Sequence, residues 1–188
     1  MAISLVKGQN ATLDSGLTKV VVGLGWDPRQ DAGSAFDLDA CAFMLGENGK
    51  VRSDSDFIFF NQRKSKCGSV EHLGDNLTGG GEGDDEQIVV DLPNVPRDVE
   101  RIVFTVTIYQ VKERKQNFGM VQNAFIRIVD ADNDVELARF ELSEDACVSE
   151  ALVFGELYRR NGAWKFRALG QGFDYEIGDL ARKYGVRV

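Results

Sequence analysis

The chain has 188 residues, 43% of them hydrophobic and 28% charged, a composition typical of one soluble globular domain and unlike that of disordered chains. The formal net charge of −8 argues against a general nucleic-acid binder, which would present a basic surface. No apolar run approaches the ~20 residues of a membrane span, and the N-terminus does not have the pattern of a signal peptide. The widely spaced Cys41, Cys67 and Cys147 are typical of free thiols in a reducing compartment. We therefore expect a single domain over residues 1–188, located in the cytoplasm.

Short β-strand patterns recur along the first part of the chain. Residues 18–26 and 57–60 are runs of β-branched and aromatic residues of strand length. Residues 87–92 and 102–109 alternate between two sets of side chains, as strands with one face in the core do. Turn sequences rich in Gly, Asn and Asp separate the strand patterns.

Two β-hairpins are predicted nearer the C-terminus. In each of them a turn sequence joins two alternating runs. The first would pair residues 125–130 with 135–142, and the second residues 152–158 with 163–169.

Helical spacing occurs at the C-terminal end of the chain. Ile177, Leu180, Ala181 and Tyr184 fall at positions i, i+3, i+4 and i+7, and Gly185 is a suitable residue to end the helix. Many short strands followed by one short helix are typical of two packed antiparallel sheets. The predicted fold class is therefore all-β: a two-sheet antiparallel β-sandwich with a short C-terminal helix.

The stretch from Gly74 to Glu86 is acidic and rich in glycine. Residues 67–96 contain seven acidic side chains and no Lys or Arg, so they carry seven of the eight net negative charges. Carboxylates, the Asn76 amide and backbone carbonyls are hard oxygen ligands, which suit Ca²⁺ and its roughly six to eight oxygens. The glycines allow turns in which carbonyls converge. A solvated, open loop is the alternative interpretation of the same composition.

Electrostatic repulsion distinguishes these two interpretations. Two carboxylates ~5 Å apart repel by roughly 3 kcal/mol at an effective dielectric constant of ~20. Several carboxylates held together without a cation would be strongly destabilised. The stretch is therefore either open or closed around a metal ion.

Three further acidic residues lie next to predicted strands. Asp37 and Asp39 flank Leu38 at the start of an apolar run, so in an extended chain both carboxylates point to one side and Leu38 to the other. Asp27 follows the run at residues 18–26 and would supply a group from another strand end. A D-x-D pair is common, so these residues become meaningful only if they converge with the Gly74–Glu86 stretch.

The turn Asp130-x-Asp132-x-Asp134, with Glu141 at the twelfth position, partly matches the calcium-binding loop of EF-hand proteins. Its sixth position is Val135 rather than glycine, and its flanks alternate as strands rather than as helices. We therefore expect a hairpin turn here.

Eight segments, spread in order over nearly the whole chain, carry a family likeness. They are Gly23-Leu-Gly-Trp-Asp27, Phe36-Asp-Leu-Asp-Ala40, Phe57-Ile-Phe-Phe-Asn61, Gly74 to Glu86, Arg114-Lys-Gln-Asn-Phe-Gly119, Ala138 to Asp145, Val153-Phe-Gly-Glu-Leu-Tyr158 and Gly170-Gln-Gly-Phe173. In these segments the chain resembles the TerD-like tellurium-resistance family of bacterial stress proteins. The most specific part is Asp-Asn-Leu-Thr-Gly at 75–79 followed by Gly-Asp-Asp-Glu at 83–86.

The resemblance implies a β-sandwich that binds two Ca²⁺ ions at one end. It also implies a role in resistance to tellurite and other stresses, with associated phage and colicin resistance. The chain departs from close relatives at Gly80, where an acidic residue is frequent, and Glu82 is expected to compensate. With that addition, the expected metal ligands are Asp27, Asp37, Asp39, Asp75, Asn76, Glu82, Asp84, Asp85 and Glu86.

We do not expect an enzyme. His72 is the only histidine and is expected to be structural or on the surface, and no nucleophile-elbow or phosphate-loop motif is present. The leading hypothesis is a calcium-binding module that acts through other proteins of the tellurium-resistance and stress system, with membrane-associated proteins among the candidates and no nucleic acid. The alternatives are Ca²⁺-dependent membrane docking and a thiol-dependent, tellurite-modifying enzyme. For the latter, Cys67 and Cys147 are expected to be exposed and Cys41 to lie in the core.

Overall fold

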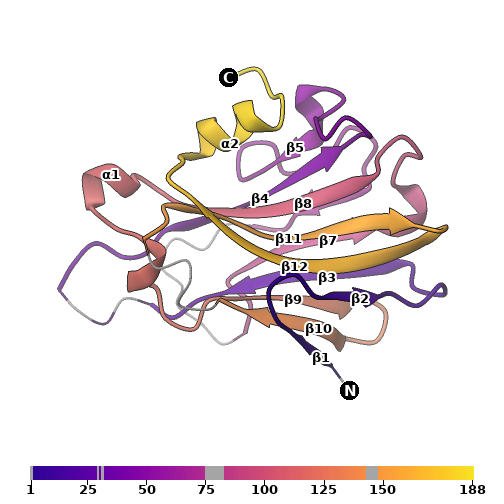
Figure 1. The fold of residues 1–188 in the computed structure, drawn as a ribbon, viewed down its shortest axis with the longest axis horizontal. Helices are drawn as coiled ribbons and strands as arrows, with labels where there is room; N and C mark the ends of the chain where they lie inside the picture. The colour runs from indigo at the N-terminus through magenta and orange to yellow at the C-terminus, as the bar shows by residue number, and fades with distance from the viewer. Residues whose placement is uncertain (1, 29, 31, 75–82, 143–147) are drawn as a thin grey trace.

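The computed structural model describes residues 2–28, 30, 32–74, 83–142 and 148–188. In this part of the chain, two six-stranded β-sheets pack face to face (Figure 1). Sheet A has the strand order β1 (Ile3–Leu5), β10 (Val135–Glu141), β9 (Phe125–Asp130), β3 (Lys19–Gly25), β7 (Glu86–Asp91) and β6 (Val70–His72). Sheet B has the order β2 (Asn10–Thr12), β12 (Ala163–Phe173), β11 (Ala151–Arg160), β8 (Arg101–Ile108), β4 (Leu38–Leu45) and β5 (Phe57–Ile58).

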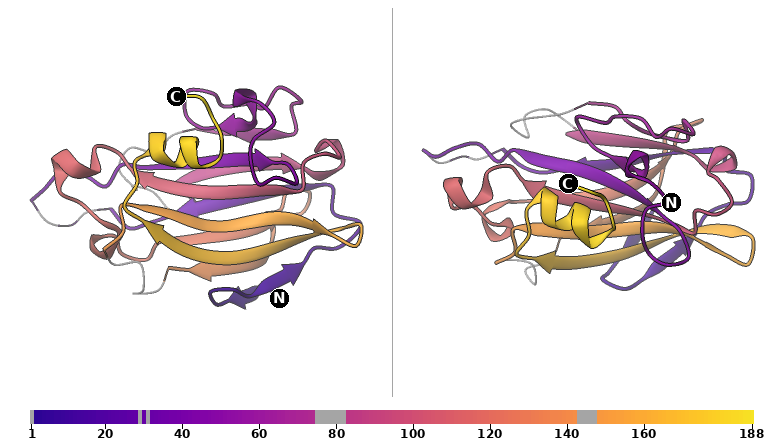
Figure 2. Two further views of the ribbon diagram at one scale, coloured as in Figure 1. Left: turned by 45° about the horizontal axis from the view of Figure 1, so that its top comes forward. Right: turned by 90° about the horizontal axis from the view of Figure 1, so that it is seen from above.

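The helical segments are short. The helix α1 (Val111–Arg114) and the 3-10 helix η3 (Phe118–Met120) follow β8, and the 3-10 helices η1 (Asp54–Asp56) and η2 (Leu92–Asn94) lie between strands. The helix α2 (Ile177–Lys183) lies over the outer face of sheet B (Figure 2). None of the helices in the described residues has the length and apolar character needed to cross a membrane.

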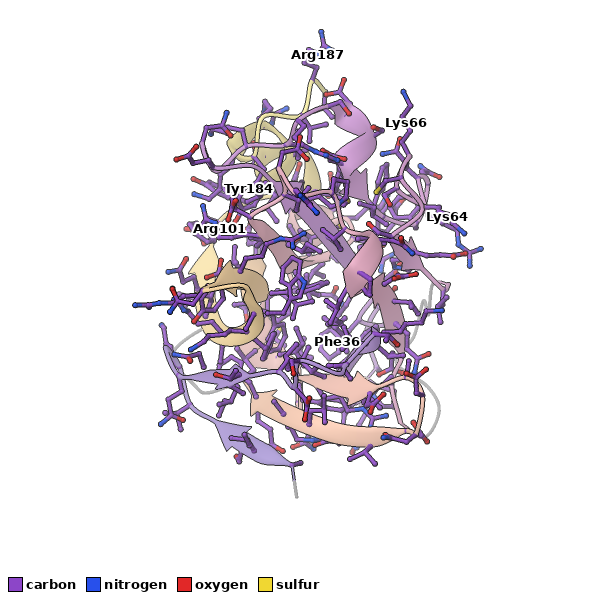
Figure 3. All side chains as sticks on the ribbon, turned by 90° about the vertical axis from the view of Figure 1, so that its right-hand side faces the viewer. Phe36, Lys64, Lys66, Arg101, Tyr184 and Arg187 are labelled. Atoms are coloured by element: carbon purple, nitrogen blue, oxygen red, sulfur yellow. The ribbon has the colours of Figure 1, made fainter. Side chains whose placement is uncertain are left out.

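The main core lies between the two sheets. Val20 and Val22 of β3 and Ile88 of β7 point into it and are fully buried. Strand β4 is buried along its whole length because α2 covers its outer face, where the ring of Phe43 lies 4.6 Å from that of Tyr184 (labelled in Figure 3). Residues 40–45 therefore form a continuous apolar run rather than an alternating one.

The structure confirms the predicted sandwich, both hairpins and the C-terminal helix. Strand β9 pairs antiparallel with β10, and β11 pairs antiparallel with β12. The helix α2 is followed at Gly185 by a positive φ of 90°, which glycine adopts without strain.

Three short strands, β1, β2 and β6, have no counterpart among the predicted elements. Each has three residues, which is too short for an alternating pattern to be recognised. Among the described strand pairs, β1 with β10 is parallel and the others are antiparallel. The N-terminal strand thus adds a parallel edge to an otherwise antiparallel sheet.

Candidate functional site

Strand register brings the acidic segments to one end of the sandwich. Leu38 at the start of β4 pairs with Ile108 at the end of β8, and Glu86 at the start of β7 pairs with Leu24 near the end of β3. Asp27 follows β3 by two residues. These strand ends lie on the side of α1 in Figure 1, and we call this side the acidic end. The expected convergence of the D-x-D pair, Asp27 and residues 84–86 on one end is therefore found.

Asp84 is bound to an arginine of the same sheet. Its Oδ1 accepts a hydrogen bond from Nε of Arg127 at 2.7 Å, and its Oδ2 accepts one from Nη2 of Arg127 at 3.0 Å. Gln87 donates a further bond to Oδ2 at 3.0 Å. The Asp84 side chain is only 1% exposed. The negative charge of Asp84 is thus compensated within the protein.

This ion pair crosses the middle strand β3 over Gly23. Gln87 and Arg127 are the register partners of Gly23 on β7 and β9, on its two sides. A Cβ atom at Gly23 would lie 2.2 Å from Oδ2 of Asp84. Glycine is therefore required here, because any side chain would occupy the space of the carboxylate.

Asp85 points differently from Asp84, toward a cavity of ≈ 410 Å³ at the acidic end. Its Oδ2 accepts a hydrogen bond from the Trp26 backbone N–H at 2.8 Å. Burial, and then the charges of Asp84 and Asp27, raise the pKa of Asp85 although the bond from Trp26 lowers it. The cavity is lined by Trp26, Asp27, Pro28, Gly83, Asp85, Asn123, Phe125, Arg139 and Glu141. Asp27 and Asp85 thus face one space, and Asp84 does not line it.

Glu86 connects the two sheets. Its Oε2 accepts a hydrogen bond from the Ala40 backbone N–H of β4 at 2.7 Å and lies 3.3 Å from Nε2 of His72. The other ring nitrogen of His72 accepts a bond from the Gly74 N–H at 3.2 Å, which assigns the ring proton to Nε2. His72 is 1% exposed, so its role is structural.

The D-x-D pair lies on the other sheet. Asp39 is buried in β4 opposite Thr107 of β8. Burial, followed by the charges of Asp39 and Glu86, raises the pKa of the Cys41 thiol well above its ordinary value. The carboxylates of Asp39 and Glu86 are therefore both close enough to Cys41 to disfavour ionisation of its thiol.

Residues of the Arg114–Gly119 segment hold the chain that leads into the D-x-D pair. Nε2 of Gln116 donates to the Ser34 carbonyl at 2.8 Å and to the Ala35 carbonyl at 3.3 Å. Arg114 donates to the Ala35 carbonyl at 3.3 Å and lies 3.9 Å from the carboxylate of Asp37. This segment is one of the eight that resemble the family, and the sequence alone indicates no role for it.

Three expected ligands, Asp75, Asn76 and Glu82, lie outside the described residues. Within the described part of the chain, no three His, Cys, Asp or Glu side chains are grouped so that they could hold a metal ion. Of the remaining expected ligands, Asp27 and Asp85 share a cavity, whereas Asp84 is bound to Arg127. Arg127 is the residue that the sequence did not reveal. The one sequence signal that could have indicated this ion pair is Gly23, because a glycine inside a strand often marks a place where other side chains approach the backbone closely.

The acidic turn between β9 and β10 is a hairpin turn, as expected. Oδ1 of Asp130 accepts the Asp132 N–H at 2.9 Å, and Oδ1 of Asn133 accepts the Val135 N–H at 3.1 Å. Asp134 has a positive φ of 57°. These acidic and amide groups are used to form the turn.

The two cysteines in the described residues differ as expected. Cys41 is fully buried, whereas Cys67 is exposed and its Sγ lies 3.1 Å from Oγ of Ser69. Burial raises the pKa of Cys67, but hydrogen bonds from Ser65 and Ser69, together with the charge of Arg52, lower it overall. Cys147 lies outside the described residues.

Fold and site together define a two-sheet β-sandwich in which acidic segments from both sheets meet at one end. The TerD domain model matches residues 1–184. The chain is 52% identical to the tellurium resistance protein TerD of Alcaligenes sp over 189 aligned positions, covering 99% of this chain and 98% of that protein. It is 50% identical to general stress protein 16U of Bacillus subtilis, with full coverage of both. A crystal structure of a protein of unknown function has a TM-score of 0.76 and 28% identity, covering 93% of this chain and all of that one.

The chain belongs to the TerD family. Its relatives at about half identity are named for tellurium resistance and for general stress. Membership in this tellurium-resistance and stress-response family therefore agrees with the resemblance seen in the sequence.

Proposed function

We propose that the chain binds calcium at the acidic end and acts in the stress response through other proteins, without catalysis. The observation that carries the proposal is that Asp27 and Asp85 line one cavity. The pKa of Asp85 is raised first by burial and then by the charges of Asp84 and Asp27, so this carboxylate is poorly solvated and lies near other negative charges. A bound cation would compensate this charge.

The chemistry of the donors favours calcium over softer metals. Apart from Arg139, whose guanidinium is bound to Glu136, the polar side chains that line the cavity offer oxygen atoms, from the carboxylates of Asp27, Asp85 and Glu141 and the amide of Asn123. Within the described residues, His72 is engaged with Glu86 and Gly74, and the Cys41 thiol is buried with a raised pKa. Zinc would prefer such nitrogen and sulfur ligands, whereas calcium takes oxygens in flexible geometry and completes its shell with water.

Two groups of acids support the proposal of two ions. Asp27 and Asp85 form the first group, at the cavity. Asp39 and Glu86, whose charges both act on Cys41, form the second group near the start of β4, and Asp37 precedes Asp39 by two residues. Asp75, Asn76 and Glu82 are proposed to contribute further ligands.

Isothermal titration calorimetry of the metal-free full chain tests this proposal. We expect micromolar or tighter Ca²⁺ binding with two sites, and weaker binding when Asp85 is changed to Asn. Asp132→Asn is the matched control, because this acid lies in the turn at the other end of β9. Absence of heat on adding Ca²⁺, or an equal loss in both variants, would refute calcium binding at the acidic end.

Docking on an anionic phospholipid surface is a second candidate. It is favoured by exposed apolar side chains beside strand ends and η3 at the acidic end: Leu73, Tyr109, Met120 and Val148, which are 44–80% exposed. Bound calcium would reduce the negative charge between them. Co-sedimentation with phosphatidylserine vesicles should then require Ca²⁺ and should be weakened by Val148→Ser but not by Val188→Ser at the C-terminus. Equal pelleting with and without Ca²⁺ would exclude this candidate.

A further inference from the structure

Asp84 and Asp85 are neighbours in the sequence but have opposite surroundings. Both oxygens of Asp84 accept hydrogen bonds, from Arg127 at 2.7 and 3.0 Å and from Gln87 at 3.0 Å. Asp85 lines the cavity, and Asp84 does not. A carboxylate that already forms a two-bond ion pair with a guanidinium has little to gain from a second cation.

Arg127 is itself held in place from the side opposite Asp84. Its Nη1 donates to Oε2 of Glu136 at 3.1 Å. Both oxygens of Glu136 also accept bonds from Arg139 at 2.9 Å, and the Arg139 guanidinium lies 4.2 Å from the centre of the Phe125 ring. The ion pair is therefore the inner end of a network that runs across β9 and β10.

The middle strand of sheet A is adapted to this network at two glycines. A Cβ at Gly23 would overlap Asp84, and a Cβ at Gly25 would lie 2.5 Å from the Phe125 ring. Gly23 and Gly25 are two residues apart in β3, so they lie on the same face of the sheet. Both ends of the network thus lie against backbone that carries no side chain.

The segment that follows Asp84 supplies the groups at the acidic end. The Asp85 N–H donates to the Leu24 carbonyl at 2.8 Å, and the Asp85 carboxylate accepts the Trp26 N–H at 2.8 Å. Glu86 then reaches Ala40 on the opposite sheet. The position of Asp84 therefore determines the backbone position from which the Asp85 and Glu86 side chains extend.

We propose that Arg127 is a positioning residue of the calcium site and that Asp84 is its anchor rather than a metal ligand. The inference rests on the proposed function. In this arrangement Asp85 binds the ion and Asp84 binds Arg127. Gly23 leaves the space that the Asp84 carboxylate occupies. Arg127 acts on the metal through the orientation of residues 84–86, without touching it.

Calorimetry of the full chain with Ca²⁺ tests the positioning role. Arg127→Met should weaken calcium binding roughly tenfold, as is typical when a group that orients metal ligands is removed, and should leave the number of sites unchanged. Arg127→Lys keeps the charge but not the two-bond geometry, so it should fall in between. Arg167→Met is the control, because Arg167 forms a cross-strand ion pair with Glu156 on sheet B, with one contact of 3.4 Å. Equal affinity in Arg127→Met and wild type would overturn the proposal.

A double-mutant cycle tests the anchor role of Asp84. If Asp84 acts only through Arg127, Asp84→Asn should weaken binding as much as Arg127→Met does, and the double variant should bind no worse than either single one. A direct ligand would instead give a further loss in the Arg127→Met background and a changed number of sites. That result would overturn the assignment of Asp84.

Amide hydrogen exchange of the metal-free protein separates this inference from the proposed function. Without calcium, Arg127→Met should speed exchange at the Trp26 and Ala40 N–H groups, which report on Asp85 and Glu86, and not at Val103 in sheet B. If wild type failed to bind Ca²⁺ but this pattern appeared, calcium binding would be refuted and the positioning of residues 84–86 would stand. Unchanged exchange at both amides would refute the positioning.

Discussion

The two acidic segments of this sandwich are held in different ways. On sheet A, Asp84 forms an ion pair with Arg127, so one carboxylate of the segment serves to hold the others. On sheet B, the neutral amide of Gln116 holds the Ser34 and Ala35 carbonyls, and Arg114 reaches the Ala35 carbonyl and lies 3.9 Å from the Asp37 carboxylate. An acidic residue of the segment that matches the family can therefore serve as the counter-charge of an arginine. Two aspartates of one segment can thus differ in role: Asp84 pairs with Arg127, whereas Asp85 lines the cavity.

The largest loss of stability is expected when a side chain is introduced at Gly23, where the Asp84–Arg127 ion pair crosses β3. In Gly23→Ala the new methyl group would lie 2.2 Å from Oδ2 of Asp84, so the ion pair must shift. Overpacking of this kind costs ~1–3 kcal/mol of unfolding free energy. Urea unfolding measures it, and Gly16→Ala is the control because its Cβ would meet nothing closer than 3.4 Å.

The double variant Gly23→Ala/Asp84→Ala sharpens this test. Removing the carboxylate removes the clash, so the alanine at Gly23 should cost much less in the Asp84→Ala background than in wild type. Equal costs in both backgrounds would show that Gly23 is needed for a reason other than the ion pair.

The sequence allowed the sandwich to be predicted because its signals are local. Alternation along 102–109 predicted β8, and the acidic turn after Asp130 predicted the β9–β10 hairpin. The role of Asp84 was not predictable in this way. Its partner Arg127 is 43 positions away in the sequence, and they meet only because β7, β3 and β9 are neighbours in sheet A. Pairing of a charge across a third strand leaves no periodic pattern.

An intermediate loss of stability is expected when Gln116, which binds the Ser34 and Ala35 carbonyls, is replaced. Gln116 is 3% exposed, and its replacement by Leu removes the donors to the Ser34 and Ala35 carbonyls. Loss of hydrogen bonds at a buried site costs ~1–2 kcal/mol, which chemical denaturation would measure. Gln122→Leu serves as a control, because it is an exposed glutamine of the same connection.

Calcium affinity of the Gln116→Leu variant tests whether the two acidic groups are independent. If the two acidic groups hold different ions, Gln116→Leu should weaken only the site near Asp39, whereas Arg127→Met should weaken the site at Asp85 and, through Glu86, also the other one. A calorimetric titration in which Gln116→Leu weakens the Asp85 site as much as Arg127→Met does would contradict the separation of the two groups.

The smallest effect is expected at Asp85 in the metal-free protein, and its sign is informative. Burial, and then Asp84 and Asp27, raise the folded-state pKa of Asp85 above the ordinary value of 3.8. Between these two pKa values the folded state binds more protons than the unfolded state, so stability falls as pH rises through that interval. Asp85→Asn cannot ionise, and its side-chain oxygen can still accept the Trp26 N–H. The variant should therefore be more stable than wild type at pH 7, by less than about 1 kcal/mol for a partly solvated charge.

The pH dependence of that difference supplies the decisive measurement. Urea unfolding with a chelator should show the advantage of Asp85→Asn at pH 7 and its disappearance below the ordinary aspartate pKa, where both proteins are neutral at this position. An excess of Ca²⁺ should reverse the order at pH 7, because at the same free concentration the ion stabilises the protein that binds it more tightly by the larger amount. A wild type that is more stable than Asp85→Asn at pH 7 without metal would mean that the protein itself compensates the Asp85 charge. Asp85 would then resemble Asp84, and the contrast between the two neighbours would be lost.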